Sequence, residues 1–215
     1  QADEAAWRDA ERLLGDELSF VLGQEHRYVT ISRCMKLISR KLVLDNMKYC
    51  QTDIRMGEDL SLLLPCLLDC EHLVVMNHKA YYHYLYVTES MAHQYDKGLY
   101  ENNRKLRKII SRILEDKCCN NNEIPMPDYA WMLDQADREY LFLLLLVLKN
   151  EARGNPGGYK KNIREICNAP EVKELVQKTV VEIHEKSNLL LYLVLLHPNA
   201  FMIRVLRMAM VWYYR

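Results

Sequence analysis

Two adjacent carboxylates follow a glycine and precede an apolar run, in the segment Gly57-Glu58-Asp59-Leu60. A carboxylate held at the rim of a cleft can act as a general base, and a helix N-terminus both fixes its position and favours its charge. Acidic residues are equally favoured in the first turn of any helix, where backbone N–H groups are unpaired. The residues alone therefore leave two interpretations open, a catalytic base and a structural helix cap.

A basic cluster precedes these carboxylates in the chain and lies close to the start of an expected helix. Guanidinium and ammonium groups at such a position can bind a phosphate together with the helix N–H groups. The same charges could instead form an ordinary solvated helix face, and the sequence does not decide between the two. The cluster consists of Arg33, Lys36, Arg40 and Lys41.

A tyrosine-rich run over residues 81–86 follows the carboxylates. On a strand, Tyr82, Tyr84 and Tyr86 would share one face, where they could stack on sugar rings or simply pack in a half-buried sheet. His93 lies in the loop beyond this run, where a histidine is either a ligand-binding group or an ordinary surface residue. Packing and surface roles are the commoner outcomes for such residues.

The spacing of apolar residues predicts the elements that position these side chains. Residues 72–87, rich in Val and Tyr, are the one stretch that predicts β structure. Elsewhere the apolar positions recur every three or four residues, as on one face of a helix. The expected helices cover residues 3–22, 35–47, 58–69, 99–118, 134–152, 159–167, 171–187 and 199–214.

This pattern predicts an α+β chain that is predominantly helical. We expect residues 1–96 to form one part, with the β stretch as the edge of a larger sheet, and residues 97–215 to form an all-α extension. A sheet of so few strands is marginal in water by itself. The first part therefore resembles a piece of a sheet domain whose other strands lie outside this sequence.

Composition narrows the class of protein. Acidic and basic residues balance at 29 each, so no global field attracts nucleic acid and we expect no nucleic-acid partner. Seven scattered cysteines are not the dense, even framework of a small secreted domain, and they predict reduced thiols in the cytoplasm. The chain opens on Gln1 directly in a helical pattern, and we expect it to be a fragment of a longer protein.

Several of these features occur in one order within residues 33–96. The order resembles the C-terminal half of bacterial family 2 glycosyltransferases, the kind found in exopolysaccharide and capsule clusters. That family has a Lys-Leu helix start, a Gly-Glu-Asp motif, an apolar helix, a tyrosine-rich strand and a Ser-Met loop. The corresponding segments are Lys36-Leu37, Gly57-Glu58-Asp59, Tyr82-His83-Tyr84 and Ser90-Met91.

The resemblance implies a GT-A fold and an inverting displacement in cell-surface polysaccharide synthesis. A sugar would move from a nucleotide-sugar donor to a glycan or lipid-linked acceptor. The resemblance also implies Mg²⁺ or Mn²⁺ held by an Asp-x-Asp motif, which has no counterpart in residues 1–32. We therefore expect an enzyme in the parent protein, and no bound metal and no activity in this chain alone.

The resemblance also implies roles for particular residues. Asp59 would take the proton from the acceptor hydroxyl, with Glu58 beside it. Substrate binding would fall to Lys36, Arg40, Tyr82, Tyr84 and His93. Three positions depart from the family pattern: Met35 before the Lys-Leu pair, Leu85 where arginine is usual, and Pro65 inside the motif helix.

The alternative is a non-catalytic helical interaction module that retains a degenerate transferase-like segment as scaffold. In that case Glu58 and Asp59 serve only to cap a helix, and a loss of about 1 kcal/mol on removing the cap is expected. The C-terminal segment 189–215 leaves its own alternatives open. It could lie on the inner face of a membrane with a basic edge, mediate homo-oligomer formation, or be buried against other helices.

Overall fold

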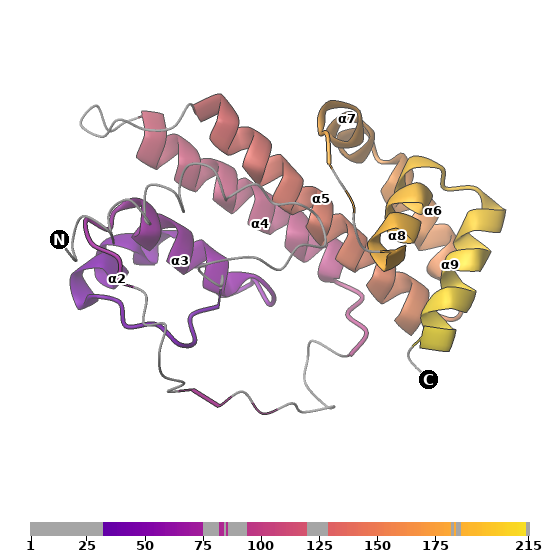
Figure 1. The fold of residues 1–215 in the computed structure, drawn as a ribbon, viewed down its shortest axis with the longest axis horizontal. Coiled ribbons are helices and arrows are strands. Elements are labelled where there is room, and N and C mark those ends of the chain that lie inside the picture. Colours follow the sequence, from indigo (N-terminus) through magenta and orange to yellow (C-terminus); the bar gives the residue numbers. More distant parts are fainter. Residues whose placement is uncertain are drawn as a thin grey trace. The chain divides into compact units, whose positions relative to one another are not determined.

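A computed structural model describes residues 32–74, 82–83, 85, 94–119, 129–181, 183 and 186–213 (Figure 1). This described part contains eight α-helices, a 3₁₀ turn and a π turn, and no β-strand. The prediction of a predominantly helical chain is confirmed. The helix expected over residues 3–22 lies outside the described part. None of the helices in the described part has both the length and the apolar character needed to cross a membrane.

The β stretch expected over residues 72–87 is described only at 72–74, 82–83 and 85, and these residues form no strand. The remainder of the stretch lies outside the described part, so the sheet edge stays a prediction. The chain divides into two compact units, and the division passes through the two longest helices. These are α4 (Leu99–Leu114) and α5 (Tyr129–Gly154). The boundary expected after residue 96 also stays a prediction.

The described part of the first unit includes α2 (Arg40–Asn46), the 3₁₀ turn η1 (Met47–Tyr49) and α3 (Glu58–Leu68). Figure 1 shows α2 beside α3, and the two helices are in contact. The helix expected from residue 35 begins later, because the Ser39 side chain accepts a hydrogen bond from the Leu42 backbone N–H at 3.2 Å. Met35 adopts a left-handed φ of 61°, which helical residues do not.

The core of the first unit joins the turn after α2 to the second half of α4. Tyr49, Ile54, Ile109 and Ile113 are buried together. Gly57 lies against this region with a φ of 86°, and a Cβ at that position would collide with the Leu106 side chain. The chain therefore requires glycine directly before α3.

Tyr49 provides a pH-dependent contribution to the stability of the first unit. Its hydroxyl donates a hydrogen bond to Asp116 Oδ2 at 3.0 Å, and burial followed by this bond raises the pKa of Tyr49 to about 12. An unfolded tyrosine ionises near pH 10, so the stabilisation is complete below pH 10 and is lost as the pH rises towards 12.

We expect the alkaline loss of stability between pH 8 and 11 to be smaller in Tyr49→Phe by on the order of 1 kcal/mol. Urea unfolding of both proteins at pH 8, 10 and 11 measures how the free energy of unfolding changes with pH. The difference between the two proteins at pH 8 gives the contribution of the hydrogen bond that Tyr49→Phe removes. Parallel pH dependences in the two proteins would contradict this assignment.

The second unit is built on the later part of α5 and four shorter helices. Six residues of the apolar run of α5 are buried, namely Tyr140, Leu141, Leu144, Leu145, Val147 and Leu148, and the three between them are half-buried. Within this unit α6 contacts α7 and α9, and α8 contacts α9 (Figure 1). The four helices are α6 (Tyr159–Asn168), α7 (Pro170–Lys178), α8 (Lys186–Leu196) and α9 (Ala200–Tyr213).

One helix prediction in this unit is wrong. The helix expected over 171–187 ends at Lys178, and Thr179 has extended angles of φ −98° and ψ 115°. Thr179, Val180 and Val181 form a β-branched run, and such residues lose side-chain freedom in a helix. The break separates α7 from α8.

A polar network lies inside the second unit around Glu151, which is almost completely buried. Its carboxylate accepts hydrogen bonds from the Tyr95 hydroxyl at 3.0 Å, from Asn155 Nδ2 at 2.8 Å and from Asn162 Nδ2 at 3.0 Å. The network ties the chain before α4 and the start of α6 to the last turn of α5. Three partners satisfy a buried charge that would otherwise destabilise the fold.

Candidate functional site

The first turn of α3 carries the two candidate carboxylates. Gly57 in its left-handed conformation is the N-cap, and its carbonyl accepts from the Leu60 and Ser61 backbone N–H groups at 3.0 and 3.3 Å. Glu58 and Asp59 are thus the first two helical residues. The Asp59 side chain is 26% exposed. The Asp59 side chain is therefore partly accessible to solvent.

A loop over residues 32–36 lies against this helix end. The Arg33 backbone N–H donates to Asp59 Oδ2 at 3.1 Å, and Arg33 Nε forms a short hydrogen bond to Asp59 Oδ1. Arg33 also approaches Glu58, with 3.6 Å between Nη2 and Oε1. The hydrogen bond to Asp59, partly offset by burial, raises the pKa of the Arg33 guanidinium. Arg33 therefore engages both oxygens of Asp59.

Lys36 belongs to the same cluster. Its Nζ donates to the Ser32 carbonyl at 2.6 Å, and its side chain is partly buried. Burial lowers the pKa of Lys36, while the negative charge of Asp59 acts in the opposite direction. The Lys-Leu segment and the Gly-Glu-Asp segment, which are distant in the sequence, are thus close enough for the charges of Lys36 and Asp59 to interact.

Tyr82 is the one described residue of the tyrosine face. A hydrogen bond involving its side chain, together with one from Ser32, lowers the pKa of the exposed Cys34 thiol. Tyr82 is therefore close to the loop that holds Arg33 and Lys36. Tyr84 and His93 lie outside the described part, and their placement stays a prediction.

The predicted site residues do not all gather at one point. Glu58, Asp59 and Lys36 share one cluster, with Tyr82 at its edge. Arg40 is exposed at the first position of α2. Within the described part, no hydrogen bond or ion pair joins Arg40 to Asp59. The sequence did not reveal Arg33 as the partner of Asp59, because Arg33 is one of several basic residues in the same segment.

The chemistry of the cluster is that of a charge-paired carboxylate, not of a metal centre. The described residues include no group of three or more His, Cys, Asp and Glu side chains arranged to hold a metal ion. Glu58 and Asp59 face a guanidinium instead. These residues do not fit a divalent cation, and a metal in the parent protein would need ligands from elsewhere.

Comparison of the chain with known proteins gave no match. No family model, no curated protein and no solved structure matches the chain.

Proposed function

We propose that this chain is the acceptor-side portion of an inverting glycosyltransferase and that Asp59 is its general base. The observation that supports this most is that Lys36 and Asp59, from two motifs that stand apart in the sequence, lie close enough for their charges to interact. The partly exposed position of Asp59 at the start of α3 also supports it, because a base must reach its substrate. The acceptor would be a glycan or a lipid-linked sugar in cell-surface polysaccharide synthesis on the cytoplasmic side.

The reaction requires a bond from the acceptor oxygen to the anomeric carbon of the donor. The bond from that carbon to the nucleoside diphosphate breaks, and the acceptor proton passes to Asp59. Each carboxylate oxygen has two lone-pair sites, and Arg33 uses one on each oxygen. A hydroxyl can therefore still approach Asp59 while Arg33 keeps the carboxylate in a fixed orientation.

Donor binding would then fall outside this chain. A GT-A sheet would supply the strands that pair with residues 72–87, and the metal and diphosphate would be held there. Arg33 and Lys36 bring positive charge close to Asp59 and could contact an anionic group of either substrate. Tyr82, next to this loop, would stack on a sugar ring.

A second candidate is a helical interaction module without catalytic activity. The observation in its favour is that Arg33 engages both oxygens of Asp59, as in an ion pair that fixes a loop on a helix. The predominantly helical described part agrees with it as well. In this case the carboxylates have a structural role alone.

Asp59→Asn in the intact protein, compared with Asp53→Asn, separates the two candidates. Asp53 is a matched control because it lies in the same unit and pairs with Lys105 instead of Arg33. Release of nucleoside diphosphate from a panel of nucleotide-sugars measures activity. Loss of release only in Asp59→Asn supports the transferase with Asp59 as its base. Absence of release from the unchanged protein and from both variants supports the interaction module.

A further inference from the structure

Helix α9 has two apolar faces, and only one of them is buried. Ile203, Leu206 and Met210 are directed into the second unit. Phe201, Met208 and Trp212 are 71%, 64% and 80% exposed. Their spacing of seven and four residues places these three on one side of the helix.

The exposed side of α9 is held in a fixed orientation. Arg207 donates hydrogen bonds to the carbonyls of Ala152 and Arg153, the latter at 2.6 Å. Its guanidinium also lies over the Tyr159 ring, 5.6 Å from the centroid. These contacts stabilise one rotation of α9, so its apolar side stays exposed to solvent.

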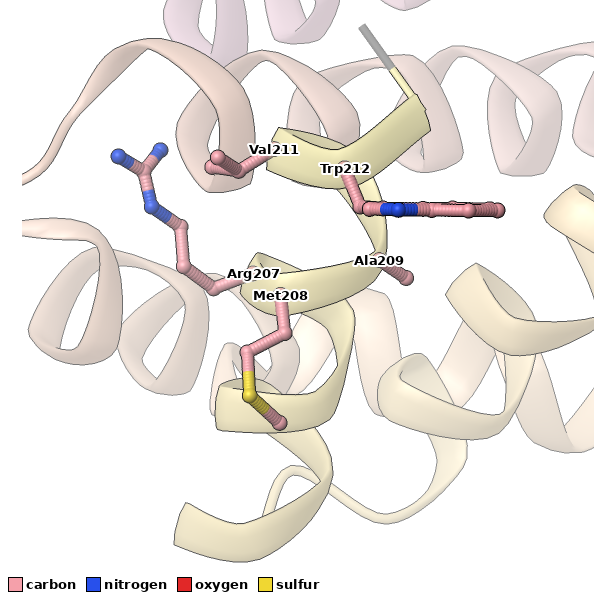
Figure 2. A pocket seen from close by; sticks show the side chains of 5 residues that line it. All are labelled: Arg207, Met208, Ala209, Val211 and Trp212. Atoms are coloured by element: carbon pink, nitrogen blue, oxygen red, sulfur yellow. The ribbon is translucent and has the colours of Figure 1, made fainter. Parts of the chain in front are cut away.

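Figure 2 shows the end of this exposed side. The Trp212 indole and the Met208 side chain project from α9 in directions different from that of Arg207. They border a shallow, open and almost entirely apolar hollow. Its lining is Arg207, Met208, Ala209, Val211 and Trp212.

The charge around this surface is predominantly positive. No acidic residue occurs from Lys186 to the end of the chain, so all 29 acidic residues precede α8. Arg204 is exposed beside the apolar side of α9. Helix α6, which contacts α9, carries Lys160, Lys161 and Arg164 against the single acid Glu165.

We propose that this side of α9, with Phe201, Arg204, Met208 and Trp212, docks on the surface of an anionic lipid bilayer. An exposed apolar stripe with a basic border is what an interfacial helix needs, and tryptophan is favoured at the level of the headgroups. A predominantly basic surface limits repulsion from anionic lipid, and Arg204 adds attraction. This docking does not depend on transferase chemistry.

Vesicle sedimentation with the full chain tests the surface. We expect binding to vesicles of phosphatidylcholine mixed with phosphatidylglycerol, weak binding to phosphatidylcholine alone, and a decrease as salt rises from about 0.1 to about 0.5 M. The double variant Met208→Gln/Trp212→Gln should bind at least about tenfold more weakly. Arg204→Gln should lower binding about fivefold.

Two exposed residues of the same unit provide controls. Val180→Gln removes an apolar side chain that is 75% exposed, and Lys173→Gln removes an exposed charge on α7. Both variants should bind vesicles as the unchanged chain does. Mixed vesicles should shift the tryptophan fluorescence to shorter wavelength, and Trp212→Phe should abolish most of that shift.

Three results would overturn the proposal. The first is equal binding to neutral and anionic vesicles, and the second is undiminished binding by the double variant. The third is self-association without lipid, measured by sedimentation velocity, that the double variant abolishes. That third result would make the exposed side of α9 a contact between two copies of the chain.

Discussion

Asp59→Asn is expected to lower sugar transfer by the intact protein about 10²- to 10⁴-fold, the usual contribution of a positioned general base. An amide cannot accept the proton that the acceptor hydroxyl loses. The asparagine keeps the size of the side chain, and its carbonyl oxygen can still accept a hydrogen bond from Arg33. The loss should therefore fall on the chemical step and leave the cluster in place.

Stability measurements distinguish this effect from loss of a helix-end interaction. The Asp59 hydrogen bonds in the cluster are donated by Arg33, and an ion pair this exposed contributes about 1 kcal/mol or less. We expect urea unfolding of Asp59→Asn to change by no more than that. Asp53→Asn should retain full transfer activity. Full activity in Asp59→Asn would eliminate Asp59 as the base.

Glu151→Ala is expected to lower the free energy of unfolding by about 3 kcal/mol, because a buried acceptor of three hydrogen bonds is lost. The substitution leaves the Tyr95 hydroxyl and two asparagine amides without their common acceptor. Each unsatisfied group costs about 1 kcal/mol or more when it stays buried. Removal of a nearly fully buried side chain also leaves a cavity in the second unit.

Glu165→Ala on α6 is the matched control. Glu165 is 65% exposed and pairs with Lys161 at 3.8 Å, a contact expected to contribute about 0.5 kcal/mol or less. Urea unfolding followed by circular dichroism measures both variants. If Glu151→Ala and Glu165→Ala unfolded at the same urea concentration, Glu151 would not organise the network as proposed.

The helical character of the chain could be predicted because it depends on local periodicity. The helix starts expected at 99, 159 and 199 agree to within one residue with those of α4, α6 and α9. The pattern missed α8 and placed the start of α5 at 134 instead of 129. Two other errors fall where a local contact overrides the pattern. The Ser39 side chain delays the start of α2, and the β-branched run after Lys178 ends α7 early.

The candidate site was only partly predictable. The Gly-Glu-Asp sequence indicated a helix start with two carboxylates, and α3 begins there. The partner of Asp59 could not be predicted, because the loop before α2, and not helical spacing, brings Arg33 to Asp59. Basic residues at 33, 36, 40 and 41 looked equivalent in the sequence, whereas only the first two contact Asp59 electrostatically in the described part.

The sequence by itself determined that the chain forms helices, where most of them begin, and that one begins with two carboxylates. These properties depend on side chains within a few positions of one another, so their spacing is sufficient. Only the tertiary structure decided that Arg33 pairs with Asp59, that Glu151 is buried, and which side of α9 is covered. Both sides of α9 are apolar, and periodicity cannot tell which one a neighbouring helix will bury.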